Sequence, residues 1–194
     1  DYAYDSVTQG GFSSVTDSNG NGASAVAQMY LADGTGAAVS AMIIRIMMSN
    51  SDVDFKDCFA DSEVFSKISG FIENPSAAVE EIKENPDVYG KLRADMTDEN
   101  AVYLASVEAM TSAMNDSEIM GAYDKICDRS GQKIGYILVD GSMLPLQYND
   151  GDSFSTIAYF ANYSVDRYGA ASQFYSYNTY YGTTVYTDAI YETL

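Results

Sequence analysis

Apolar residues recur at helical spacing in the first part of the chain. They stand at Ala25, Val26, Met29 and Tyr30 and, after a Gly-rich break at 33–36, at Ala38, Met42, Ile46 and Met47. A recurrence every three to four residues places apolar side chains on one face of a helix. The pattern therefore predicts two helices with buried faces, in which the methionines are core residues.

A helical middle follows. Residues 51–69 carry a weaker amphipathic pattern of Phe, Val and Ile. Two Asn-Pro pairs, at 74–75 and 85–86, are each typical of an N-cap followed by a proline in the first turn of a helix. We therefore expect two further short helices, each beginning at its proline.

Two stretches favour strands. Residues 101–107 are β-prone, with a helix expected from Glu108 and another over 117–127. Tyr-Ile-Leu-Val within 135–139 predicts a buried strand that ends at Asp140-Gly141. Strand, helix and strand together predict a mixed α/β fold that is helix-rich and has a small sheet.

The length of 194 residues is enough for a single globular domain with its own core. Within it we expect a helix-rich α/β core over 1–146 and a Tyr-rich part over 147–194 that belongs to the same domain. That last part holds 10 of the 17 tyrosines and a single basic residue, Arg167. No run approaches the ~20 apolar residues of a membrane span, so any membrane part is expected outside this sequence.

Charge excludes several classes of function. Ten Lys and Arg stand against 28 Asp and Glu, which gives a formal net charge of -18. So acidic a surface repels phosphate backbones, and nucleic acid is therefore not an expected partner. The chain has no His, so a serine triad, a His-Glu zinc site and a Cys-His protease are excluded as well.

Three local motifs are candidates for chemistry. Asp17, Asn19 and Asn21 precede Gly22 at the spacing of a calcium loop, but Gln28 stands where a bidentate Glu is expected, so a self-satisfied turn is favoured. Asn-x-Ser sequons at 115–117 and 162–164 are possible glycan acceptors. Two cysteines are too few for a disulfide framework, and one disulfide stays open.

The start of the chain has an order of segments that one enzyme family shares. Asp1-Tyr2-Ala3 comes first, and Ser-Val-Thr-Asp-Ser-Asn-Gly at 14–20 then precedes the expected helical segments at 27–31 and 37–42. This order resembles the C-terminal globular domain of the catalytic subunit of oligosaccharyltransferase, of the archaeal or bacterial single-subunit type. That family transfers a lipid-linked oligosaccharide to the Asn of Asn-x-Ser/Thr sequons. The end of its Trp-Trp-Asp-Tyr-Gly motif would be Asp1, Tyr2 and Ala3, with alanine in place of glycine.

Later patches keep the order of the family. Residues 102–110 are similar to its strand and turn before the helix with the second short motif, 136–143 to a later strand, and 158–163 to a segment near the end. The second motif, Asp-x-x-Lys or Met-x-x-Ile, would begin at Met110. Ala113 stands where Lys or Ile is expected, so either Met114 takes that place through an offset or the role is lost.

The resemblance implies that Asp1, Tyr2 and Met110 bind the Ser or Thr of an acceptor peptide. Asp1 would accept the hydroxyl proton, and Met110 would contact the Thr methyl and favour Thr over Ser by under ~1 kcal/mol, the value of one buried CH₂. The family's divalent metal, Mn or Mg, and its catalytic carboxylates belong to its membrane-embedded part, as does the site for the lipid-linked oligosaccharide. We therefore expect no metal ligand in this fragment, no activity of the fragment alone, and a domain on the extracellular face of the cell membrane.

Two other classes of function stay open. A secreted acidic calcium-binding or adhesion module fits the charge, the Tyr-rich end and the loop at Asp17. A soluble enzyme of another type fits a strand that ends at Asp140, although the sequence offers no recognisable pair of nucleophile and base.

Overall fold

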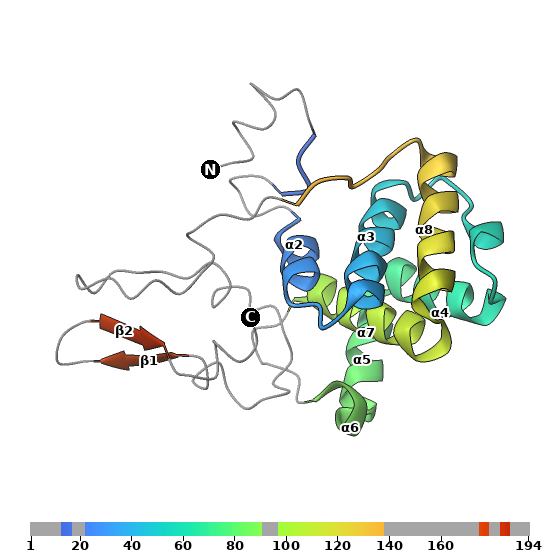
Figure 1. The fold of residues 1–194 in the computed structure, drawn as a ribbon. Helices are drawn as coiled ribbons and strands as arrows, with labels where there is room; N and C mark the ends of the chain where they lie inside the picture. Colours follow the sequence, from blue (N-terminus) through green and yellow to red (C-terminus); the bar gives the residue numbers. More distant parts are fainter. Residues whose placement is uncertain (1–12, 17–21, 91–96, 138–174, 179–182, 187–194) are drawn as a thin grey trace.

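The computed structural model describes residues 13–16, 22–90, 97–137, 175–178 and 183–186. Most of these residues form helices (Figure 1). The helices are α2 (Ala23–Tyr30), α3 (Thr35–Ser49), α4 (Ser62–Glu73), α5 (Pro75–Glu84), α6 (Pro86–Tyr89), α7 (Asp98–Ala113) and α8 (Asp116–Ser130), and a 3-10 turn η1 (Lys56–Cys58) precedes α4. Strands β1 (Tyr175–Asn178) and β2 (Thr183–Tyr186) form an antiparallel hairpin in which Tyr175 lies opposite Tyr186.

Helix α7 lies at the centre of the helical body. It contacts α2, α3, α4, α5 and α8. Four consecutive residues, Asn100, Ala101, Val102 and Tyr103, are each at most 3% exposed. Because four residues complete a helical turn, their burial means that neighbouring segments cover this part of α7 on every side. Ser24 of α2 donates a buried hydrogen bond to Asn100 Oδ1 and so ties the first described helix to this centre.

Helices α3 and α8 lie side by side and run in the same direction (Figure 1). Near their starts, Gly36 lies so close to Asp116 that an added Cβ would be 2.5 Å from its Oδ1 atom. Beyond their ends, Asn50 Nδ2 donates to Gln132 Oε1 at 3.1 Å, and Gln132 Nε2 donates back to Asn50 Oδ1 at 3.2 Å. Glycine at position 36 therefore permits the close approach at one end of the pair.

The expected helices are largely confirmed. Helices α2 and α3 lie where apolar periodicity predicts them, α8 includes the helix expected over 117–127, and α5 and α6 each begin at the proline of an Asn-Pro pair. The pattern over 51–69 divides into the turn η1 and helix α4, because Asp61 caps α4 and sets a new helix start within the stretch.

The mixed α/β fold was wrong, and the described part of the helical body holds no strand. Residues 101–107 lie inside α7, whose start is fixed by Thr97 as N-cap and by acidic side chains in the first turn. The expected strand at 135–139 has no regular structure over 135–137, where Tyr136 is 82% exposed, and its last two residues lie outside the described part. Among the residues that the structure describes, β1 and β2 are the strands, and neither coincides with an expected one.

Two further findings bear on the sequence predictions. No helix among the described residues has the length and the apolar composition that a membrane span requires. Cys58 and Cys127 are both free thiols, and burial raises the pKa of each above its ordinary value.

Candidate functional site

A surface groove of about 390 Å³ lies where α4, α5, α6 and α7 meet. The segments around it are far apart in sequence, since α4 begins at Ser62 and α7 ends at Ala113. The lining side chains divide into an apolar set and a charged or polar set. They are Val64, Val88, Tyr89, Ala109 and Ala113 on the one hand, and Asp61, Glu63, Lys67, Glu81, Asn85, Glu108 and Ser112 on the other.

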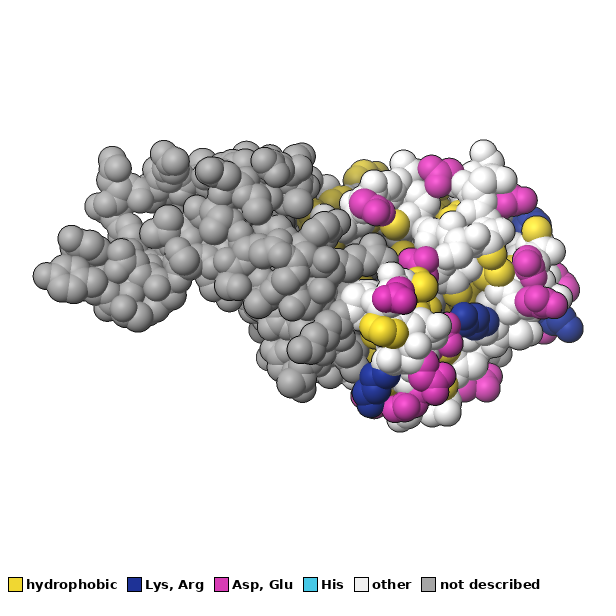
Figure 2. Space-filling model, turned by 90° about the horizontal axis from the view of Figure 1, so that it is seen from below, with side chains coloured by type: hydrophobic (Ala, Val, Ile, Leu, Met, Phe, Trp, Pro, Cys, Tyr) yellow, Lys and Arg dark blue, Asp and Glu magenta, His cyan; other side chains and the backbone are white. Residues whose placement is uncertain are grey.

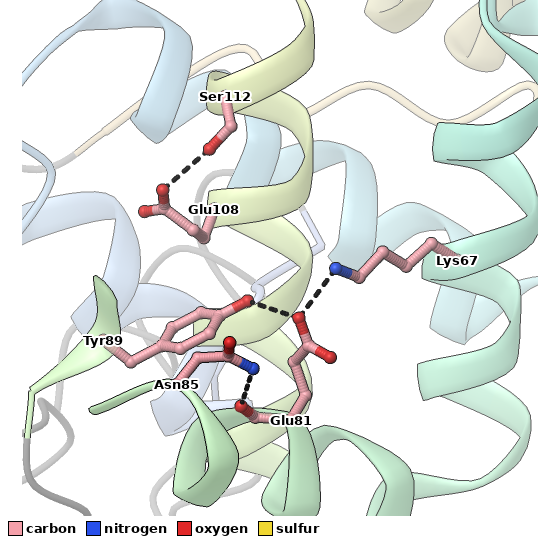
Figure 3. Close-up of polar contacts among 6 residues, drawn as sticks. All are labelled: Lys67, Glu81, Asn85, Tyr89, Glu108 and Ser112. Atoms are coloured by element: carbon pink, nitrogen blue, oxygen red, sulfur yellow. Dashed lines mark hydrogen bonds and ion pairs between the residues drawn. The ribbon is translucent and has the colours of Figure 1, made fainter. Parts of the chain in front are cut away.

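Glu81 is the centre of the polar contacts in the groove (Figure 3). Its Oε1 atom accepts a hydrogen bond from Lys67 Nζ of α4 at 2.7 Å, and the two side chains form an ion pair between α5 and α4. Tyr89 donates its hydroxyl to the same oxygen at 3.4 Å, which is a long hydrogen bond. The backbone carbonyl of Glu81 accepts from Asn85 Nδ2 at 2.9 Å. Glu81 thus joins α4, α5 and the short helix α6.

The phenol of Tyr89 is buried in the groove and lies under the influence of two carboxylates. Its side chain is 3% exposed, and its pKa is raised above the ordinary value by burial first and then by the charges of Glu81 and Glu108. Both carboxylates therefore act on one phenol, although they come from different helices. The phenol stays neutral at physiological pH and remains a hydrogen-bond donor.

The other acidic side chains in the lining have different local partners. Asp61 caps α4, and its Oδ1 atom accepts from the backbone amide of Glu63 at 2.7 Å. Glu108 accepts from Ser112 Oγ at 2.7 Å, one turn further along α7 (Figure 3). Lys67 is the one cation among the lining residues, against four carboxylates. The same imbalance is visible in Figure 2, where magenta acidic side chains outnumber dark-blue basic ones on the face shown.

The groove combines carboxylates with small apolar side chains. Carboxylates at its edge attract a cation, and the Val and Ala side chains offer an apolar surface for the carbon stem that carries the charge. The groove is small for a binding site, since its volume lies near the lower end of ligand pockets.

The residues expected to recognise an acceptor peptide are placed as follows. Asp1 and Tyr2 lie outside the described residues. Met110 belongs to α7 and is 0% exposed, packed in the hydrophobic core, and Met114 is 7% exposed. Met110 has no exposed surface in this conformation, so its contact with a Thr methyl stays a prediction.

Two other sequence candidates lie only partly within the described residues. Residues 17–21 of the possible calcium loop are outside them, whereas Gly22 has a φ of 76° and Gln28 is 9% exposed on α2. The sequon at Asn115 is described, and its side chain is occupied as the N-cap of α8. The sequon at 162–164 and the dipeptide at 140–141 fall outside the described part of the chain.

The described part of the chain contains no group of three or more His, Cys, Asp or Glu side chains placed to hold a metal ion. The expectation of Mn or Mg concerned a membrane-embedded part outside this sequence, so this finding does not test it.

Sequence reasoning missed the groove itself. Lys67, Glu81, Tyr89 and Glu108 are spread over 42 positions and form no motif. One signal was present, because the Asn-Pro pair at 85–86 predicts that one helix ends and another begins there. The new helix carries Tyr89, whose hydroxyl contacts Glu81, eight residues earlier.

Comparisons with protein-family models, with characterised proteins and with solved structures gave no match for this chain.

Proposed function

We propose that this chain is the extracytoplasmic globular domain of a membrane oligosaccharyltransferase, and that it contributes to recognition of the Ser or Thr in an acceptor sequon. The observation that carries the proposal is the sequence Asp1-Tyr2-Ala3 followed, in the order of that family, by a Gly- and Asn-rich turn and two helices. Helices α2 and α3 are consistent with this order. The later correspondence at 102–110 gives less support, since a strand was expected there and the residues are helical.

The physical basis of the proposed role is hydroxyl recognition. A carboxylate such as that of Asp1 accepts a hydrogen bond from Ser or Thr, which a peptide with an apolar residue at that position does not supply. A buried carboxylate left without its partner loses the free energy of that hydrogen bond, so the wrong peptide is rejected. Transfer of the oligosaccharide itself needs the metal and the carboxylates of the membrane part, and the lipid-linked donor binds there as well.

The first prediction concerns Asp1 in the intact membrane protein. We expect Asp1→Ala to abolish transfer to an Asn-x-Thr peptide, because the hydroxyl then loses its acceptor. Asp5→Ala is the matched control, since it removes the same charge four residues away and should leave transfer unchanged. Transfer is measured on membranes with a labelled acceptor peptide, with protein amounts equalised by immunoblot.

Two outcomes would contradict the proposal. Transfer that Asp1→Ala leaves intact would remove the assigned role, and transfer by the 194-residue chain alone would place the catalytic groups within it. The competing hypothesis is a secreted calcium-binding or adhesion module. Calorimetric titration with Ca²⁺ supports that alternative if it finds a site that Asp17→Ala removes.

A further inference from the structure

We propose that Asn115, at the connection between α7 and α8, is an attachment site for an N-linked glycan. This inference deepens the function proposed above and rests on it in one respect, because it makes this chain itself a substrate of the oligosaccharyltransferase. The evidence is separate, since it consists of the sequence, burial and hydrogen bonding of described residues, whereas the proposed function is based on residues at the start of the chain.

The acceptor tripeptide lies on the surface. Asn115, Asp116 and Ser117 have the sequence of an acceptor sequon, and all three residues are exposed. The residues around the tripeptide are buried, since Met114 is 7% exposed and Ile119 is 0% exposed. The backbone is extended at Met114 and Asn115, before α8 begins at Asp116. A bulky hydrophilic group on Asn115 would therefore reach solvent and displace no core side chain.

The hydrogen bonds of Asn115 involve its amide oxygen and not its amide nitrogen. The Oδ1 atom accepts from the Glu118 backbone amide at 3.1 Å, whereas Nδ2 donates to no group in the part of the chain that the structure describes. An N-linked glycan is attached through Nδ2, and the glycosylated amide keeps its carbonyl oxygen as an acceptor. Attachment would therefore leave the cap of α8 intact.

The transfer itself is a substitution at C1 of the first sugar. The bond between C1 and a phosphate oxygen of the lipid-linked donor breaks, and the lipid phosphate leaves with the electron pair. A bond forms between C1 and Asn115 Nδ2, which gives up one proton to a carboxylate of the transferase. Asp116 and Ser117 lie in the first turn of α8, so a transferase that binds both the Asn and the Ser side chain acts before this turn has formed.

The chain contains an internal control at Asn74. Asn74-Pro75-Ser76 has the same pattern with proline in the middle, and Asn74 is also exposed at the N-cap position of a helix, α5. Proline at the middle position excludes a tripeptide from the acceptor motif. The two asparagines are thus matched in exposure and position but differ in the motif, so a glycan on Asn115 alone would indicate sequon recognition.

The test uses the intact membrane protein, purified from the cells that produce it, digested with trypsin and analysed by mass spectrometry. Cleavage after Lys and Arg places Asn115 on the peptide 94–125 and Asn74 on the peptide 68–83. The other sequon, at 162–164, falls on a separate peptide, 134–167. We expect a glycan mass on 94–125, located at Asn115 by fragmentation, and an unmodified peptide 68–83.

Three variants make the test specific to the sequon. Asn115→Asp keeps an oxygen that can cap α8 and removes the acceptor amide, and Ser117→Ala keeps Asn115 and its cap but removes the hydroxyl. Both should abolish the glycan on 94–125. Ser112→Ala is the matched control, since it removes a hydroxyl from an exposed position on the same peptide outside the sequon, and it should leave the glycan in place. Immunoblots equalise the protein amounts.

Several results would overturn the inference. An unmodified peptide 94–125, in a protein that transfers glycan to an Asn-x-Thr peptide, would contradict it and leave the proposed function standing. A glycan that survives Asn115→Asp would lie on another residue, and one that survives Ser117→Ala would not depend on the sequon. A glycan on Asn74 would show that the motif does not select the site. Conversely, a glycan on Asn115 in membranes that transfer nothing to the peptide would support this inference and contradict the proposed function.

Discussion

Three hydroxyl groups in the core lack a hydrogen-bond partner among the described residues. They belong to Ser40 of α3 and to Tyr103 and Ser106 of α7, all 0% exposed. Burying a hydroxyl without a partner destabilises the folded state, because the group gives up its hydrogen bonds with water. Tyr123 presents the opposite case. Its hydroxyl donates to the Ile134 carbonyl at 2.8 Å and accepts from the Ile134 amide at 3.0 Å, which fixes the chain after α8.

Removing the hydroxyl should therefore have opposite effects at the two buried tyrosines. We expect Tyr103→Phe to leave the free energy of unfolding unchanged or to raise it by up to about 1 kcal/mol, since no bond is lost. Tyr123→Phe should lower it by about 1–2 kcal/mol, because the two backbone groups of Ile134 lose their partner. Urea denaturation of the two variants in parallel measures the difference. A marked loss of stability for Tyr103→Phe would mean that its hydroxyl has a partner after all.

At the level of elements, the starts of the helices differ in how they are held. Asn115 caps α8 in a reciprocal arrangement. The Glu118 backbone amide donates to Asn115 Oδ1 at 3.1 Å, and the Asn115 backbone amide donates to Glu118 Oε2 at 2.9 Å. Asn74 occupies the N-cap position of α5 without any side-chain cap hydrogen bond. The proline that follows it fixes the first turn instead.

Substituting these two asparagines tests that difference. Asn115→Ala should lower the free energy of unfolding by about 1 kcal/mol, because the Glu118 backbone amide loses its side-chain acceptor and the capping box is broken. Asn74→Ala is the matched variant and should have an effect within about 0.5 kcal/mol, as expected for an exposed position without a cap bond. Both values come from urea denaturation followed by circular dichroism. Equal losses would contradict the distinction between the two helix starts.

Local sequence patterns predicted most helices, and they failed where tertiary packing determines the secondary structure or the burial of a segment. Periodicity was sufficient for α2 and α3, and the Asn-Pro pairs located α5 and α6. Residues 101–107 were misassigned because their apolar run fits a buried strand as well as a helix that is covered on all sides. The cap at Thr97 and the acidic pair after it were the local signal for a helix. At 135–137 the apolar residues predicted a buried strand, yet Tyr136 and Ile137 are exposed.

At the scale of the whole molecule, the groove could not be predicted from the sequence. Its lining joins α4, α5, α6 and α7, and contacts between such distant segments depend on how the helices pack around α7. Composition did indicate the sign of its charge, since acidic residues dominate the chain. The residues predicted from the family resemblance cannot be compared with the groove, because Asp1 and Tyr2 lie outside the described part and Met110 faces the core.

Three buried phenols make the stability of the whole fold sensitive to alkaline pH. Burial is the first cause that raises the pKa of Tyr89, Tyr103 and Tyr123, in the last case to about 12, from an ordinary value of 10.0. A group whose pKa is higher in the folded state keeps its proton there after the unfolded chain has lost it. The resulting stability is complete below the unfolded pKa and is lost as pH rises through the folded pKa.

We therefore expect the free energy of unfolding to fall steeply once the pH exceeds 10.0, the ordinary value for these phenols. Each phenol held neutral contributes a slope of about 1.4 kcal/mol per pH unit in this window. Urea denaturation at a series of pH values, with tyrosinate absorbance recorded alongside, measures both the slope and the phenols that titrate late. Repulsion among the acidic side chains is already complete below this pH, so it cannot produce the same dependence. The buried thiols of Cys58 and Cys127, whose pKa is also raised, contribute to the slope in the same direction. Tyr103→Phe should therefore make the slope shallower without abolishing it, and an unchanged slope in that variant would show that the Tyr103 phenol is not among its causes.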